Sequence, residues 1–386
     1  MLHRDSARRP GEAVLVSAGE AVPEFGRSAS PVELMARASM AALDAAGLTT
    51  HDVDGLASSS IDYYMPTLSL GDELGIRPRF IDSTSLGGSS SFAQLEHAIL
   101  AVESGTCDVV LIAFGSTSRS DPRGVHRLTE ASAFERPHGY VYPLGGFALM
   151  AARHMGIYGT TPEQLALVAV CARRWAALTP GAERPEPIDV NDVLASPLIV
   201  SPLHRLDCCL VSDGGSAVLL TRRDRAADLP TNPVRILGIA EAQSHRHISG
   251  MRDLTVSPAR ESGRLAMAQA GVTIADIDLL QLYDAATITV LMTLEDLGFC
   301  GKGEGGPYIE RMQRDFGPGG SLPLNTNGGG LAYRHPGMLG LYLLGEAIAQ
   351  LQRRAEARQV EPAHVALVHS LCGVFGASGT AILGVD

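Results

Sequence analysis

The sequence has few charged residues, few aromatic residues and no long apolar run. Of its 386 residues, 19% are charged and 5% are aromatic, whereas 45% are hydrophobic, so small and aliphatic side chains must build most of the interior. This composition excludes a disordered chain and is typical of a packed globular enzyme. No apolar run reaches the roughly 18 to 20 residues of a membrane helix, so we expect no membrane span.

Basic residues are outnumbered by acidic ones. The formal net charge is -11, from 31 Lys and Arg against 42 Asp and Glu. Nucleic acid is therefore not expected as the main partner, because phosphate binding needs a basic surface.

Paired-cysteine motifs and a secretory leader are missing as well. The six cysteines show no CxxC spacing, and the neighbours Cys208 and Cys209 are poorly placed for a disulfide with each other. Residues 1–10 are basic and polar with no apolar segment behind them, unlike a signal peptide. We expect reduced thiols, a cytoplasmic protein and a frayed N-terminal tail.

What the sequence does contain is an internal repeat. Residues 41–56 and 265–280 each read as a helix ending at a glycine, a turn with threonine and a downstream aspartate, and the start of a strand at Val53 or Ile277. Each copy continues with a Gly-rich turn, an amphipathic helix and a β-branched strand. Strands that alternate with helices in this way predict mostly parallel sheets with helices on their faces.

The repeat divides the chain into two related α/β halves, as its length also suggests. Residues 11–118 and 200–228 form the predicted N-terminal half, and residues 233–386 form the C-terminal half. Residues 119–199 interrupt the first half with Pro and Gly turns and a helix-like segment at 162–177, so we interpret them as an inserted loop domain.

Three motifs of the second half resemble those of thiolases. Residues 325–336, from Asn325 to His335-Pro, resemble the Asn-x-x-Gly-Gly-x-x-x-x-x-His-Pro motif, and residues 370–376 are similar to the C-terminal Cys-x-Gly loop. Tyr283-Asp-Ala stands where thiolases carry Asn-Glu-Ala, and residues 294–304 are closest to the sterol-carrier-type branch. The resemblance covers nearly the whole chain and implies a layered αβαβα fold and acyl-CoA thioester chemistry.

The nucleophile of that family is absent. Thiolases place an acylating cysteine on the Gly-rich turn of the first half, at a helix N-terminus that favours a thiolate. We align that position with Ser85. A serine hydroxyl is too weak an acid for such help alone, so Ser85 could be a nucleophile only if a base such as His335 reached it. Otherwise Ser85 is a capping or oxyanion-lining hydroxyl.

The resemblance assigns acid/base chemistry to His335 and proton transfer to Cys372. The alternatives are a turn histidine bonded to backbone and a small buried thiol. It also implies that a set of loop residues binds the substrate or its CoA. These residues are Asn325, Gly328, Gly329, Gly373 and Arg334. For Arg334 a substrate carboxylate, a CoA phosphate and plain solvent all stay open.

Two tyrosines change the expected reaction. Steroid side-chain aldolases of the same superfamily resemble this sequence in carrying tyrosines at Tyr333 and Tyr283, and both are catalytic there. A retro-aldol cleavage needs a base and donors to the enolate but no covalent nucleophile. Against this, those aldolases have no counterpart of Cys372, and both tyrosines could simply pack in the core.

We therefore expect an enzyme that makes or breaks a C–C bond beside an acyl-CoA thioester, by aldol chemistry. The alternatives are a Claisen-type acyltransferase using Cys372 or Ser85, and a non-catalytic acyl-CoA-binding or lipid-binding subunit. The resemblance implies a homodimer, no bound cofactor beyond the CoA of the substrate, and a small OB-fold, zinc-ribbon partner. His245 and His247 have metal-ligand spacing, but nothing nearby completes a tetrahedral set, so we predict a surface loop and no metal.

Overall fold

The computed structural model describes residues 12–24, 29–61, 64–121 and 132–385. The N-terminal tail expected to fray lies outside the described residues, as do residues 122–131 of the predicted inserted domain.

One mixed sheet runs through the described part of the molecule. Its nine strands follow the order β3-β2-β4-β7-β1-β8-β11-β10-β9. Strands of the N-terminal half are β1 (Ala13–Ala21), β2 (Gly55–Ser59), β3 (Phe80–Asp82), β4 (Val109–Ser116) and β7 (Gly214–Arg222). Strands of the C-terminal half are β8 (Val234–Gln243), β9 (Leu279–Leu282), β10 (Val365–Cys372) and β11 (Ala377–Gly384). The sheet passes from one half to the other where Val14 and Leu15 pair with Arg235 and Val234.

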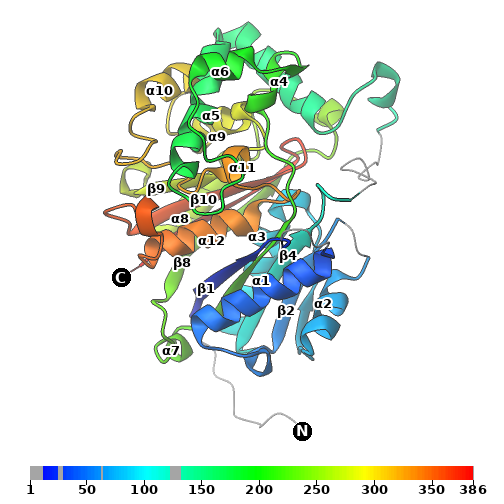
Figure 1. Ribbon diagram of the computed structural model, residues 1–386, viewed down its shortest axis with the longest axis vertical. Coiled ribbons are helices and arrows are strands. Elements are labelled where there is room, and N and C mark those ends of the chain that lie inside the picture. Colours follow the sequence, from blue (N-terminus) through cyan, green and yellow to red (C-terminus); the bar gives the residue numbers. More distant parts are fainter. Residues whose placement is uncertain (1–11, 25–28, 62–63, 122–131, 386) are drawn as a thin grey trace.

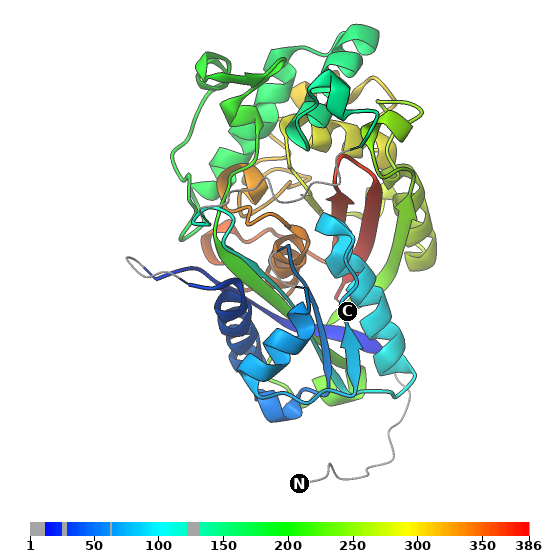
Figure 2. The ribbon, with the colours of Figure 1, turned by 90° about the vertical axis from the view of Figure 1, so that its right-hand side faces the viewer.

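Helices complete five layers (Figures 1 and 2). Helices α1 (Pro31–Ala46) and α2 (Pro66–Leu74) cover the outer face of the N-terminal strands, and α8 (Ala259–Ala270) covers β8 and β11. Helices α3 (Ser90–Glu103) and α12 (Gly340–Leu351) lie side by side in the middle and contact strands of both halves. The predicted αβαβα fold is confirmed.

The prediction of mostly parallel strands is wrong. Strand β2 is parallel to β3 and β4, and β9 is parallel to β10, but every other pairing is antiparallel. The reason is that no helix crosses the sheet just before the last strand of each half, since the helices between β4 and β7 pack on helices of the C-terminal half. Strand β11 returns from β10 through the tight turn 373–376, and β7 returns from β4 through the inserted segment. A crossover helix is what makes sequential strands parallel.

The repeat appears in detail. Helices α1 and α8 end at Gly47 and Gly271, whose φ angles of 67° and 68° are left-handed and favour glycine. In the turns that follow, the Asp52 carboxylate accepts the Thr49 backbone N–H at 2.9 Å, and Asp276 accepts that of Thr273 at 2.7 Å. The downstream aspartate of each copy is thus a cap of the turn.

Each strand of the repeat begins two residues later than expected, after a second aspartate. Asp54 accepts the backbone N–H groups of Asp108 and Val109 at 2.8 and 2.9 Å. Asp278 does the same for His364 and Val365 at 2.8 and 2.9 Å. These carboxylates fix the start of the neighbouring strand, so Val53 and Ile277 precede the ladder.

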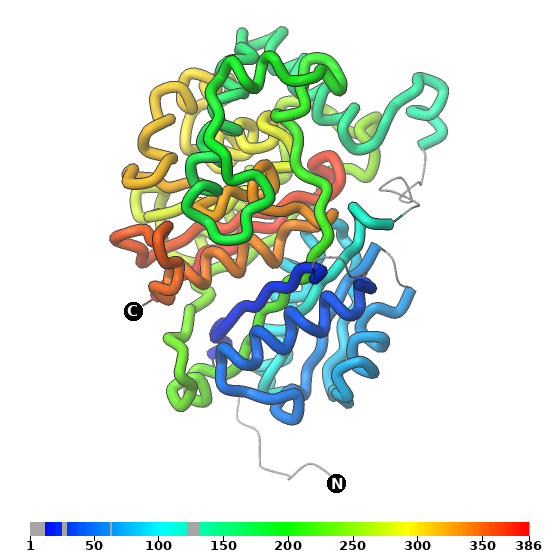
Figure 3. Tube along the Cα trace, in the orientation of Figure 1, coloured from blue at the N-terminus to red at the C-terminus, as the bar shows by residue number. Residues whose placement is uncertain are grey.

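The segment predicted as an inserted domain lies over the C-terminal half (Figure 3). Its helices are α4 (Leu144–Tyr158), α5 (Pro162–Ala176) and α6 (Val190–Ala195). Strand β5 (Leu198–Val200) crosses the predicted boundary at 199 and pairs with β6 (Leu203–His204) beyond it. Helix α5 packs against α9 (Thr287–Leu297), α10 (Gly305–Met312) and α11 (Gly329–Ala332), and a short α7 (Arg223–Ala226) precedes β8. The predicted helix at 162–177 is confirmed, and Pro162 stands at its first turn after the cap Thr161.

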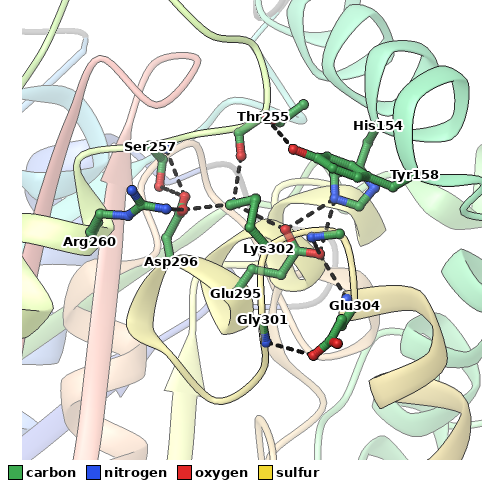
Figure 4. A network of polar contacts seen from close by, with 12 residues as sticks. His154, Tyr158, Thr255, Ser257, Arg260, Glu295, Asp296, Gly301, Lys302 and Glu304 are labelled. Atoms are coloured by element: carbon green, nitrogen blue, oxygen red, sulfur yellow. Dashed lines mark hydrogen bonds and ion pairs between the residues drawn. The ribbon is translucent and has the colours of Figure 1, made fainter.

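A cluster of buried charged side chains connects α4 to α9 (Figure 4). We call His154, Glu295, Asp296 and Lys302 the Lys302 cluster. The Lys302 ammonium lies 3.0 Å from Glu295 and 2.7 Å from Asp296, and the His154 ring lies 3.1 Å from Glu295. The side chains of His154, Glu295 and Asp296 are fully buried. Lys302 is the only lysine in the sequence.

All six cysteines are free thiols. Within the described ranges no helix combines the length and apolarity needed to cross a membrane.

Candidate active site

Buried Tyr283 and half-buried His335 form a pair between two elements of the C-terminal half. Tyr283 directly follows β9, and His335 follows α11 on the Gly-rich turn. The Tyr283 hydroxyl lies 3.0 Å from His335 Nε2, and the rings meet edge to face at 5.5 Å. The two thiolase-like motifs therefore meet in space.

Burial keeps both groups neutral. It lowers the pKa of His335 to about 4, and it raises the pKa of Tyr283 well above its ordinary value, with nearby Cys209 and Cys372 adding to the rise. The His335 ring also bonds to its own backbone carbonyl. The tautomer of the neutral imidazole decides which of Nε2 and the Tyr283 hydroxyl donates in their hydrogen bond. The pair can pass a proton between phenol and imidazole.

Asp284 braces the turn that carries His335. Its buried carboxylate accepts the backbone N–H groups of Gly330 and Leu331 at 2.7 and 3.1 Å. Burial raises the pKa of Asp284 to about 7, against these hydrogen bonds. An ideal Cβ on Gly329 would collide with the Asp284 carboxylate, and the φ angle of Gly329 is 58°. Gly329 thus allows the carboxylate to cap α11.

Asn325, predicted to bind substrate, connects the turn to β9. Its side-chain amide accepts the Leu282 N–H at 2.7 Å and donates to the Leu282 carbonyl at 2.9 Å. Gly328 has a φ angle of 101° and its Cα faces Ala176 of α5, where an ideal Cβ would lie 2.8 Å from the Ala176 Cβ. Both residues shape the site through packing, since their contacts are to protein backbone and core.

Cys372 faces the turn before α3, but it meets a glycine there. An ideal Cβ on Gly87 would lie 3.0 Å from Cys372 Sγ, and one on Gly88 would lie 2.7 Å from Cε2 of Tyr283. Ser85 stands two residues earlier and is exposed. In this turn Gly87 is thus the residue that faces Cys372.

Tyr333 points to a different partner from Tyr283. Its hydroxyl donates to the Glu20 carboxylate at 2.6 Å, on β1 of the other half. Burial raises the pKa of both Tyr333 and Glu20. The structure brings Tyr283, His335 and Cys372 together, and it pairs Tyr333 with Glu20 instead.

Arg334 does not point into solvent, which was one of the three surroundings considered from the sequence. It is buried, and its guanidinium donates to the Gly181 carbonyl at 2.9 Å and lies 5.2 Å from the Tyr333 ring centroid. It ties the inserted segment to the Gly-rich turn.

The histidine pair at 245 and 247 is not a plain surface loop. His245 is buried, and its Nε2 lies 3.0 Å from the carbonyl oxygen of Val374, in the loop after Cys372. His247 is half-exposed, 3.8 Å from Glu135. Among the described residues no group of three or more His, Cys, Asp or Glu side chains could hold a metal ion.

Sequence reasoning missed two side chains beside Cys372. Tyr142, from the inserted segment, has its hydroxyl 2.8 Å from the position of an ideal Cβ on Gly373. The Arg246 side chain bonds to that hydroxyl. In the sequence His245-Arg-His247 was considered only for metal binding by its two histidines. No local pattern in the sequence connects residue 142 with residue 373.

Known proteins resemble this chain over most of its length. Residues 240–385 match a family described as thiolase C-terminal domain-like. An acetyl-CoA acetyltransferase of Methanothermobacter thermautotrophicus is 32% identical, over 91% of this chain and 93% of its own. The 17-hydroxy-3-oxo-4-pregnene-20-carboxyl-CoA lyase of Mycobacterium tuberculosis is 34% identical, over 89% and 92%. The steroid side-chain-cleaving aldolase of Thermomonospora curvata is 34% identical, over 98% and 99%.

A solved structure gives the same picture. The Ltp2-ChsH2(DUF35) aldolase superposes with a TM-score of 0.88 at 32% identity, over 98% of each chain. The similarity therefore includes both halves and the inserted segment.

Proposed function

This chain belongs to the thiolase superfamily, and from that premise we propose that it is an acyl-CoA carbon–carbon lyase of aldol type. Its substrate class is a β-hydroxyacyl-CoA, and the names of two relatives suggest a steroid side chain. The observation that carries the proposal is Gly87 at the turn facing Cys372, together with the Tyr283–His335 pair.

Aldol cleavage suits a site without a nucleophile on that turn. The β-hydroxyl loses its proton, the Cα–Cβ bond breaks, and its electron pair forms the enolate of the thioester. A proton then reaches Cα, which leaves a carbonyl compound and a shorter acyl-CoA. No acyl-enzyme forms, and no electron acceptor is consumed. CoA takes part only as the carrier of the substrate.

Tyr283 and His335 fit the enolate side of this reaction. A phenol whose pKa is well above its ordinary value stays protonated and can donate to an enolate as charge develops. Neutral His335 fixes the hydroxyl at 3.0 Å and can share its proton.

A Claisen-type reaction through Cys372 is the second candidate. Cys372 lies against the helix-terminal turn, and a relative is an acetyl-CoA acetyltransferase. Burial, however, raises the pKa of the Cys372 thiol, with Arg246 only opposing the rise, so the thiolate is disfavoured.

The deciding assay gives the protein two thioesters. With 17-hydroxy-3-oxo-4-pregnene-20-carboxyl-CoA we expect a 17-ketosteroid and propionyl-CoA, followed by liquid chromatography and mass spectrometry. With acetoacetyl-CoA and free CoA we expect no acetyl-CoA. If acetoacetyl-CoA is thiolysed and the hydroxyacyl thioester is not cleaved, the protein is a Claisen-type enzyme. If both thioesters bind tightly and neither is turned over, the protein is a binding subunit.

Two assembly features belong to the same proposal. A small DUF35 protein is named with the Ltp2 aldolase, so the assay is run with and without such a partner. A homodimer would pair the edge strand β3, beside which Ile81, Leu68 and Leu100 are 51%, 53% and 61% exposed. Ile81→Arg should shift the protein to the monomer in sedimentation, and an unchanged dimer would place the interface elsewhere.

A further inference from the structure

The segment 208–213 lies along the Gly-rich turn that carries His335. It leads from the end of the inserted segment into β7. Its backbone is bonded to the turn at two points, because the Leu210 N–H donates to the Gly330 carbonyl at 2.9 Å and the Ser212 N–H donates to the His335 carbonyl at 3.1 Å. The segment is therefore a direct neighbour of the Tyr283–His335 pair.

The Ser212 side chain adds a second bond to His335. The His335 backbone N–H donates to Ser212 Oγ at 3.0 Å. Together with the Ser212 N–H bond, this contact means that one residue holds both polar groups of the His335 backbone. Ser212 is fully buried. The imidazole that projects from this backbone lies 3.0 Å from the Tyr283 hydroxyl, so the place of the ring depends on the Ser212 bonds.

The next residue, Asp213, fixes Ser212 from the opposite direction. Its carboxylate accepts the backbone N–H groups of Arg119 and Ser120 at 2.8 and 3.1 Å. Arg119 and Ser120 follow β4, where the chain leaves for the inserted segment. The two ends of the inserted segment are thus joined beside His335. A residue that is itself held by neighbours can hold a reacting group precisely.

A second buried serine nearby makes no such contact. Ser216 lies on β7, four residues after Ser212, and is also fully buried. Its hydroxyl has no hydrogen-bond partner among the described residues. Burial of a hydroxyl at the start of β7 therefore does not explain the contact of Ser212, and the two serines form a matched pair for experiment.

We propose that Ser212 is a positioning residue for His335, and that its hydroxyl keeps the imidazole within hydrogen-bond distance of Tyr283 during cleavage. The assignment rests on the aldol function proposed above. Ser212 acts through the His335 backbone, and no proton of the reaction passes through its hydroxyl. Without that hydroxyl the His335 N–H loses its acceptor, so the turn must move to satisfy it.

The kinetic test uses the full chain with a DUF35 partner and 17-hydroxy-3-oxo-4-pregnene-20-carboxyl-CoA. Ser212→Ala should lower kcat about ten- to a hundredfold with little change in KM, because a small displacement of a reacting group costs that much. Ser212→Thr keeps the hydroxyl and should recover most of the rate. The matched control, Ser216→Ala, should keep the wild-type kcat.

Two kinetic results would overturn the inference and leave the function standing. One is a wild-type kcat in folded Ser212→Ala, and the other is an equal loss in Ser216→Ala. If Ser212→Ala does not fold, Ser212→Cys takes its place, since it keeps the volume and replaces the oxygen by a weaker acceptor.

Nuclear magnetic resonance decides the inference without turnover. Histidine labelled at its ring nitrogens gives a His335 signal that is identified by its loss in His335→Ala. Tyr283→Phe removes the hydroxyl bonded to Nε2 and should shift this signal. Ser212→Ala should shift it in the same direction, and Ser216→Ala should not. An unchanged His335 signal in folded Ser212→Ala would contradict the inference, whereas absence of cleavage by the wild type would count against the proposed function alone.

Discussion

The Lys302 cluster and the Tyr283–His335 pair differ in charge. In the Lys302 cluster the buried carboxylates of Glu295 and Asp296 each lie within 3.0 Å of the Lys302 ammonium. The Tyr283–His335 pair consists of two neutral rings joined by a hydrogen bond. His154 and Lys302 keep the pKa of Glu295 low although burial opposes them, so Glu295 stays ionised. Around His335 burial acts without a charged partner and displaces the pKa to about 4. Because its charges are paired, the Lys302 cluster can hold two helices together. Because the Tyr283–His335 pair has no charged partner, its groups stay neutral and can transfer a proton.

Removing the cation from the Lys302 cluster should have the largest effect. Lys302→Met leaves Glu295 and Asp296 as buried, uncompensated carboxylates, so the free energy of unfolding should fall by about 3–5 kcal/mol. Urea denaturation measures it. The control is Arg264→Met, which removes a cation from an exposed pair with Glu261 and should change stability little. Equal losses in the two variants would mean that the cluster is no stronger than a surface pair.

His335→Ala should lower the cleavage rate about 10²- to 10⁴-fold without unfolding the protein. Because burial holds the pKa of His335 at about 4, the wild-type imidazole should stay neutral, and its contribution intact, from pH 8 down to about 5. Below its unfolded pKa the unfolded state binds the extra proton, so His335 should also reduce stability as pH falls toward 4. A folded His335→Ala variant with normal turnover would identify His335 as only a turn residue.

Tyr283→Phe should lower the rate roughly a hundredfold with little change in melting temperature, because one donor to developing charge is lost. Tyr308→Phe, on α10 outside the site, serves as the control.

The family resemblance predicts a similar loss of rate for Tyr333→Phe. The structure adds a loss of stability of about 1–3 kcal/mol there, since the Glu20 carboxyl would lose its donor. A rate loss confined to Tyr283 would separate the two tyrosines.

Cys372→Ala should change aldol cleavage no more than a few-fold, because the proposed steps do not use the thiol. The measurement pairs the hydroxyacyl thioester with acetoacetyl-CoA. If wild type thiolyses acetoacetyl-CoA and Cys372→Ala does not, while Tyr283→Phe remains fully active, the aldol assignment is wrong.

The smallest effect is expected at Ser85. Incubation with acetyl-CoA should leave no acyl group on the protein, because the Ser85 hydroxyl is exposed and no base bonds to it in the described structure. Intact-mass spectrometry measures this, and Ser85→Ala is the control that assigns any adduct. A stable adduct that is present in the wild type and absent in Ser85→Ala would favour the alternative function, a Claisen-type acyltransferase that uses Ser85.

Local patterns in the sequence determined much of the fold. The helix caps and capped turns of the repeat depend on contacts within a few residues, at Gly47 and Asp52 in one copy and at Gly271 and Asp276 in the other. The repeat could therefore be recognised from the sequence. The pairing of His335 with Tyr283 was also accessible, because both lie in motifs of fixed spacing.

Other features were decided only by tertiary structure. The sheet is mixed because β7 and β11 return without a crossover helix, which an alternating pattern does not reveal. That Gly87 faces Cys372, two residues after the exposed Ser85, follows from the path of the turn before α3 and not from the residue types. Tyr142 and Arg246 reach Cys372 from segments more than a hundred residues away, and only the packing of the inserted segment on the C-terminal half brings them together.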